Sequence, residues 1–108
     1  MSVDYAAVVI YGYKNDEKTY NFIEAEGYDV MREIAKEYNC YINTWCCCEH
    51  DYFLGVECGS INIEYNTFSE LDFRQTAYFT ALDRILKKIN ITPPNITPKL
   101  MLINGITY

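Results

Sequence analysis

The hydrophobic positions of this chain recur with two different periods, and the change of period separates predicted strands from predicted helices. An almost unbroken apolar run within residues 3–13 predicts a strand that is covered on both faces. Residues 99–103 predict a last strand, followed by an Asn-Gly turn signal and a short end strand over 106–108. Residues 19–23 alternate weakly and predict a short return strand.

Apolar residues at helical spacing predict two helices. The first covers residues 27–39, and Asn39 suits a left-handed helix end. The second and longer helix opens at Ser69, because Ser69 and Asp72 are close to a capping box, and it continues to Ile89. Each helix therefore buries one stripe and exposes the opposite side to solvent.

The middle of the chain predicts a β-hairpin formed by residues 40–48 and 52–58. If His50 and Asp51 form a two-residue loop, this loop sets the register of the two strands, whereas a loop one residue longer would shift it. Cys47 then lies opposite Leu54, and the predicted core face holds Trp45, Cys47, Leu54, Val56 and Cys58.

The order of the elements predicts the fold class. Gly59-Ser60 ends the hairpin, and the alternating residues 61–65 predict one more, half-exposed strand. We expect a single α+β domain over residues 1–108, with a mainly antiparallel sheet of four to six strands and two helices packed on one face. The order is related to the ferredoxin-like βαββαβ arrangement, a likeness of topology that implies no activity.

Negative charge is concentrated in the middle third of the chain. The net charge is −6, and residues 37–73 hold seven carboxylates but no lysine or arginine. A negative field opposes direct binding to nucleic acid and favours a cationic protein partner. The alternative is that an acidic surface only keeps the protein in solution.

Carboxylates and tyrosines interleave along this acidic segment. Such a surface can imitate a phosphate backbone and bind an arginine-rich groove. The first predicted function is therefore a non-enzymatic binding protein that docks on a cationic protein, for example a nucleic-acid-binding enzyme. Its predicted partner-binding residues are Glu49, Asp51, Tyr52, Glu57, Glu64, Tyr65, Glu70 and Asp72.

The cysteines provide a further hypothesis, the third in order, which is a zinc-binding module. Cys46, Cys48 and His50 project to one side of a strand, and Cys40 or Cys58 would have to complete a tetrahedral site. The Cys-x2-Cys spacing of structural zinc sites is missing, however, and reduced cysteine is a common core residue. We therefore predict no metal and no cofactor, and keep the zinc module as an alternative.

Catalytic and phosphate-binding motifs are missing from the sequence. His50 and Asp51 are adjacent on a loop, with no nucleophile marked beside them, so no catalytic residue and no enzyme is predicted. Gly12 belongs to no glycine-rich phosphate loop and indicates a bulge or a close backbone approach. The second hypothesis is a nucleotide- or small-ligand-sequestering protein in which tyrosines stack on the base and the phosphate-binding residues are Arg84, Lys87 or Lys88.

The general character of the chain indicates its surroundings. The chain starts without a secretory signal and has no run long enough to span a membrane, so we expect a cytoplasmic protein with reduced thiols, as a monomer or a homo-oligomer. A small, acidic single domain rich in residues with AT-rich codons resembles the small phage-encoded inhibitors of bacterial defence, of the anti-CRISPR type. The resemblance implies a protein that occupies the basic groove of a nucleic-acid-handling enzyme in a bacterial host.

Overall fold

The chain forms one antiparallel sheet with helices on one of its faces. The computed structural model describes residues 5–47, 51–62, 67–68, 73–91 and 97–107. The strands are β1 (Tyr5–Asn15), β2 (Ile42–Cys47), β3 (Asp51–Asn62), β4 (Thr67–Phe68) and β5 (Lys99–Thr107). The helices are α1 (Glu17–Phe22), the π-helical turn η1 (Ile23–Gly27), α2 (Tyr28–Glu37) and α3 (Gln75–Lys88).

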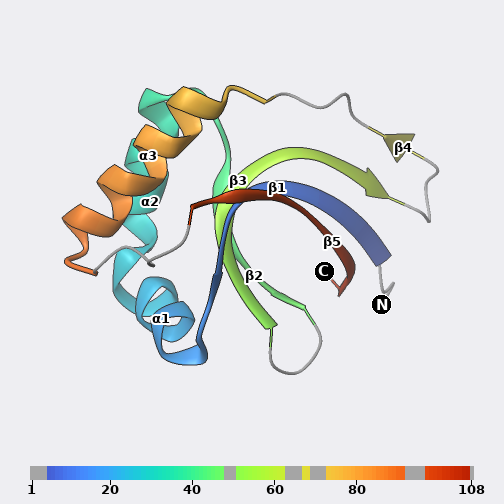
Figure 1. Cartoon of the computed structure of the whole chain (residues 1–108). Coiled ribbons are helices and arrows are strands. Elements are labelled where there is room, and N and C mark those ends of the chain that lie inside the picture. Colours follow the sequence, from blue (N-terminus) through green and yellow to red (C-terminus); the bar gives the residue numbers. More distant parts are fainter. Residues whose placement is uncertain (1–4, 48–50, 63–66, 69–72, 92–96, 108) are drawn as a thin grey trace.

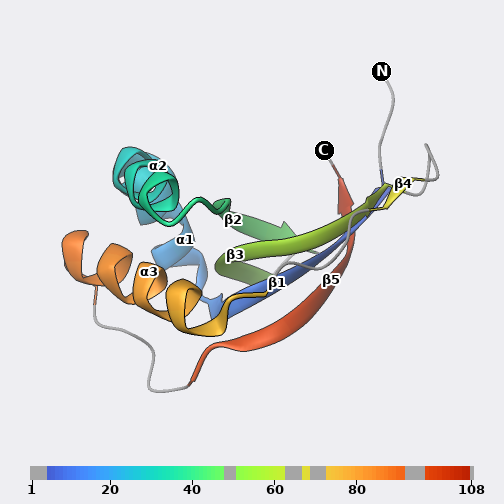
Figure 2. The ribbon, with the colours of Figure 1, turned by 90° about the horizontal axis from the view of Figure 1, so that it is seen from above.

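The main strands are hydrogen-bonded in the order β2-β3-β1-β5, and every pair is antiparallel. The two-residue strand β4 extends the far end of β3. Figures 1 and 2 show the helices gathered on one side of this sheet. The predicted α+β class with two main helices on an antiparallel sheet is therefore confirmed, with a strand number at the low end of the predicted range.

Two glycines lie opposite each other where β1 and β3 run side by side through a strongly curved sheet (Figure 1). They are Gly12 and Gly55. A Cβ atom at Gly12 would lie 2.0 Å from the carbonyl oxygen of Leu54. Only a residue without a side chain permits such a close approach of two backbones, so the expectation from the sequence is confirmed.

Each face of the sheet has its own apolar cluster. The larger cluster lies between the sheet and the helices, and its fully buried members include Ile23, Met31, Leu54, Val56, Tyr78, Leu82, Ile85 and Leu86. The smaller cluster fills the concave face and consists of Val8, Ile10, Trp45 and Ile103. Strands β2 and β5 lie at opposite edges but approach each other across this concave face.

The register of the hairpin differs from the prediction. Cys47 pairs with Asp51 instead of Leu54, and Trp45 pairs with Phe53. This pairing is three positions away from the predicted one, and an odd shift moves side chains to the opposite face. Trp45 therefore packs in the concave cluster, while Leu54 lies under the helices.

The predicted return strand over residues 19–23 is wrong, because this segment belongs to α1 and η1. Asp16 starts the helix: its Oδ1 accepts a hydrogen bond from the backbone nitrogen of Thr19 at 2.7 Å. This cap satisfies one of the free N–H groups of the first turn.

Three element boundaries also differ. The predicted break at Gly59-Ser60 is wrong, because β3 continues through it to Asn62 with a bulge next to Cys58. The predicted turn at Asn104-Gly105 is wrong, because β5 continues with a bulge at this point. Helix α3 begins at Gln75, and the predicted cap residues Ser69 and Asp72 lie outside the described residues.

Within the described residues, no helix has both the length and the apolar character that crossing a membrane requires.

Candidate functional site

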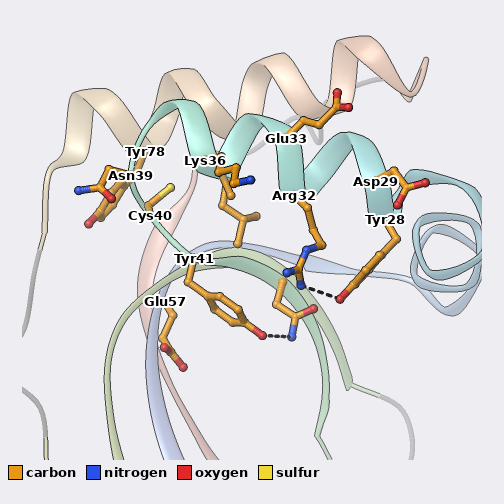
Figure 3. Close-up of a pocket in the computed structure, with 13 residues that line it drawn as sticks. Tyr28, Asp29, Arg32, Glu33, Lys36, Asn39, Cys40, Tyr41, Glu57 and Tyr78 are labelled. Atoms are coloured by element: carbon orange, nitrogen blue, oxygen red, sulfur yellow. Dashed lines mark hydrogen bonds between the residues drawn. The ribbon is translucent and has the colours of Figure 1, made fainter.

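A pocket of about 730 Å³ opens between helix α2 and the beginning of the edge strand β2 (Figure 3). Its volume is within the range of pockets that hold small ligands. Its lining comes from α2, from the connection to β2, and from single residues of β3 and α3. The lining residues are Tyr28, Asp29, Arg32, Glu33, Ala35, Lys36, Asn39, Cys40, Tyr41, Ile42, Asn43, Glu57 and Tyr78.

The helix side of the pocket holds two bases, Arg32 and Lys36, and two acids, Asp29 and Glu33. Tyr28, Arg32 and Lys36 are spaced four residues apart, so they form one ridge along α2. An Arg32 Nη1 hydrogen is donated to the Tyr28 hydroxyl at 2.9 Å, and the guanidinium lies 5.4 Å from the centre of the Tyr28 ring. Figure 3 shows both side chains extending toward the strands, while Glu33 extends away from them.

The end of α2 brings β2 underneath this ridge. Asn39 has a φ of 51°, and the backbone nitrogen of Cys40 donates to the carbonyl oxygen of Ala35 at 3.0 Å. A left-handed residue after a helix reverses the chain while satisfying the last carbonyl groups. The predicted left-handed end at Asn39 is therefore confirmed, and it directs Tyr41 and Asn43 beneath the helix.

The strand side of the pocket is aromatic and polar. Tyr41 is 51% exposed, and its hydroxyl accepts a hydrogen bond from Asn43 Nδ2 at 3.3 Å. Tyr28, which is also exposed, is held by Arg32 on the helix side. The two exposed tyrosyl rings therefore line one pocket, each with its hydroxyl engaged by a neighbouring side chain.

A half-buried carboxyl group, Glu57, completes the lining. Its backbone nitrogen donates to the carbonyl oxygen of Tyr41 at 2.8 Å, which fixes the pairing of these two residues. Burial raises the pKa of the Glu57 carboxyl above its ordinary value. This group therefore takes up a proton more readily than an exposed glutamate.

Some cations of the described chain are paired with carboxylates, whereas the pocket cations, like Lys18, Lys88 and Lys99, are not. Lys14 pairs with Asp51 at 2.9 Å, Lys87 pairs with Asp83 at 2.8 Å, and Arg84 pairs with Glu37. Within the described ranges, Arg32 and Lys36 form no ion pair. Their charges are therefore available to an anion that enters the pocket.

The predicted acidic surface can be compared with the structure at three of its eight residues. Glu49, Glu64, Tyr65, Glu70 and Asp72 lie outside the described residues. Asp51 is paired with Lys14, and the Tyr52 ring packs against Tyr20 with 4.9 Å between the centroids. Glu57 lines the pocket, six residues further along β3. Tyr52 faces the helices, whereas Asp51 and Glu57 alternate onto the other face, so these three do not form one surface.

The cysteines do not gather around a metal in the part of the chain that the structure describes, where no group of three or more potential ligands occurs. Cys58 is buried in the core beneath the helices, and Cys46 is exposed on β2. The observed register places both on the same face, which corrects the predicted opposite orientation. The side chains of Cys47, Cys48 and His50 are not among those described.

The sequence reading did not identify the α2–β2 pocket. The i, i+4 spacing of Tyr28, Arg32 and Lys36 was a usable signal within the predicted helix. Tyr41 and Asn43 gave no such signal, because their position under α2 follows from the pairing of β2 with β3.

Comparisons with known proteins add no relative: no protein-family model, no curated protein and no solved structure matches the chain.

Proposed function

We propose that this protein is a non-enzymatic binding protein whose α2–β2 pocket holds a small anionic ligand with an aromatic ring, of the nucleotide class. The observation that supports it most is that Arg32 and Lys36, which form no ion pair with another described residue, lie on the helix ridge of a pocket that two exposed tyrosines also line. Guanidinium and ammonium groups bind phosphate, and tyrosyl rings stack on bases.

The polar groups of the lining suit the rest of such a ligand. Asn39 and Asn43 offer amide donors and acceptors to a base or a sugar, and Glu57 offers a carboxyl with a raised pKa. In this proposal the phosphate-binding residues are Arg32 and Lys36, in place of the α3 cations expected from the sequence. Arg84 and Lys87 of α3 are already engaged by carboxylates.

A thermal-shift series with mononucleotides and with inorganic phosphate tests the proposal. A nucleotide at ten times its dissociation constant adds about 1.4 kcal/mol to the unfolding free energy, which raises the Tm by several degrees. The double variant Arg32→Gln, Lys36→Gln should lose this shift, and Tyr41→Ala should weaken it. Stabilisation by phosphate alone would point to an anion site without base recognition.

The matched control is the double variant Lys87→Gln, Lys88→Gln, which removes the same charge from α3. It should bind nucleotides like the unmodified protein. Equal loss in both double variants would show that only net charge matters, and no stabilisation by any nucleotide at millimolar concentration would refute the proposal.

Docking of the acidic surface on a cationic protein stays a prediction, as do the resemblance to phage inhibitors and the cytoplasmic location in a bacterial host. Support for docking comes from the base-free stretch of the sequence. The triple charge reversal of Glu57, Glu64 and Asp72 should weaken such a complex, and so should added salt. A complex that is indifferent to both changes would contradict it.

A further inference from the structure

Among the described strands, β5 is an edge of the sheet, and the described helices pack mainly on the other strands. Helix α3 packs on β1 and β3, and α1 and α2 pack on β3 and β2. On the helix side of β5, Leu100 is 51% exposed and Leu102 is 67% exposed. Two large apolar side chains are thus open to solvent in a region where a sheet is normally covered.

Two phenylalanines extend this exposed surface. Leu100 pairs with Tyr11, and the Tyr11 ring packs against the exposed Phe73 at 5.2 Å between centroids. Phe79, also exposed, lies on α3 and shares an i, i+4 ridge with Asp83. We call Phe73, Phe79, Leu100 and Leu102 the β5 patch.

The ridge of Phe79 and Asp83 points toward the sheet side of α3 and away from α2. Asp83 lies near β1, as its effect on Tyr13 shows. Burial raises the pKa of the Tyr13 hydroxyl, and the nearby Tyr11 and Asp83 raise that pKa further. The opposite flank of α3 carries Arg84, which pairs with Glu37 of α2. Phe79 therefore lies on the flank that borders β5.

The free edge of β5 also offers backbone hydrogen bonds. The bond from the Glu57 nitrogen to the Tyr41 oxygen shows which residues of β3 bond to β2. Because bonded residues alternate along each strand, the register through β3 and β1 makes Lys99, Met101 and Ile103 bond to β1. The N–H and C=O groups of Leu100 and Leu102 then point to the open edge.

We propose that two copies of this chain associate through β5, as an antiparallel pair of strands centred on Met101. In this register Leu100 of one copy faces Leu102 of the partner subunit, and the reverse. The N–H and C=O groups of Leu100 and Leu102 then form hydrogen bonds with the C=O and N–H groups of the same two residues in the partner subunit. The apolar side chains form one continuous stripe between the two α3 helices. A two-fold axis makes the same patch complementary to itself.

The antiparallel pairing centred on Met101 favours a second copy over an unrelated partner, because the same strand supplies both halves of the pair. The β5 patch exposes roughly 300–400 Å² of apolar surface, the size at which a patch on a monomer is often functional. With the strand edge added it stays below the roughly 800 Å² per partner of a standard interface, so we expect a weak dimer. Lys99 lies opposite Ile103 of the partner subunit in this register, so no like charges meet.

The net charge of −6 on each copy gives the association a specific salt dependence. Two acidic copies repel each other at low ionic strength, and salt screens this repulsion. Dimer formation should therefore strengthen as salt is added. A complex with a cationic protein, or the binding of an anion at Arg32 and Lys36, should weaken with salt instead.

The experiment combines sedimentation over a concentration series with amide hydrogen exchange on the unmodified protein. We expect a monomer–dimer equilibrium and concentration-dependent protection of the Leu100 and Leu102 amides. Ile42 and Thr44, whose amides point outward from the other edge strand β2, are the internal control and should not respond. A monomer at about 500 µM, or protection on β2 alone, would overturn the proposal.

Variants provide a second and independent measurement. Leu102→Lys places a charge in the β5 patch and should raise the dimer dissociation constant by about tenfold or more. Phe22→Lys makes the same kind of change at another exposed apolar position and should leave the dimer intact. Equal effects of the two variants would contradict an interface at β5. The nucleotide-binding experiment does not depend on the outcome of these dimer measurements, because the pocket lies at the other edge of the sheet.

Discussion

Replacing Gly12 by alanine tests the idea that the curvature of the sheet depends on a close contact between two backbones. The added Cβ would lie 2.0 Å from the Leu54 oxygen and 2.5 Å from the Gly55 Cα. Real Cβ atoms essentially never approach within 3.0 Å, so β1 and β3 would have to separate by about 1 Å. Both neighbours are backbone atoms, and no side-chain rotation can relieve the clash.

The magnitude follows from the hydrogen bonds beside the two glycines. Tyr11 pairs with Val56 and Tyr13 pairs with Leu54 on either side of Gly12. Losing two ladder bonds costs about 2 kcal/mol, and overpacking costs about 1–3 kcal/mol more. We therefore expect Gly12→Ala to lower the unfolding free energy by about 3–5 kcal/mol, which lowers the Tm by roughly 15 °C or more.

Two other glycines make a graded control series. In Gly55→Ala the new Cβ meets the Ile10 Cδ1 and the Tyr11 oxygen at 3.0 Å, so we expect a smaller loss of about 1–2 kcal/mol. In Gly27→Ala the nearest atom is 3.4 Å away, and alanine favours the helix, so stability should stay equal or rise by up to about 1 kcal/mol. Urea denaturation followed by circular dichroism measures all three. A Gly12→Ala protein as stable as Gly27→Ala would refute the reasoning.

Three further predictions concern the concave cluster, the pocket and the end of α2. Trp45 is 4% exposed, so Trp45→Ala should cost about 3–5 kcal/mol in urea denaturation, and a loss below about 1 kcal/mol would contradict its burial. Burial raises the folded-state pKa of Glu57, so the ionised carboxylate lowers the stability of the protein at pH values above that pKa. The lost stability returns as the pH falls toward the pKa of the unfolded state. The stability advantage of Glu57→Gln over the unmodified protein should accordingly be largest at neutral pH and shrink on acidification, and an advantage that grows in acid would be inconsistent with desolvation. Asn39 has a φ of 51°, so Asn39→Ala should cost about 1–2 kcal/mol while Asn39→Gly costs less, and the reverse order in thermal melts would exclude a left-handed helix end.

Local patterns in the sequence were sufficient for the main elements. The stripe around Met31 and Ile34 predicted α2, and the stripe from Ala77 to Ile89 predicted most of α3. The apolar runs at 3–13 and 99–103 predicted β1 and most of β5. These features depend on the spacing of neighbouring residues along one element, which is visible without any knowledge of its partners.

The candidate site depends on partners that are distant in the sequence. Arg32 and Tyr41 line one pocket because the chain reverses at Asn39 and β2 then pairs with β3. The acidic residues chosen from the sequence were neighbours in the chain, but Asp51 pairs with Lys14 of β1, and Glu37 of the same base-free stretch pairs with Arg84 of α3. A charge pattern shows where charges occur and does not show which of them meet.

The amino-acid order alone therefore determined the fold class, the two main helices, and the need for a glycine at position 12. Only the assembled sheet decided the hairpin register that turns Trp45 to the concave face, the pocket beneath α2, and the open edge at Leu100 and Leu102. The physical reason is the side-chain period of a strand: a shift of one position exchanges its faces, and the energy that selects between the two registers comes from contacts across the whole sheet.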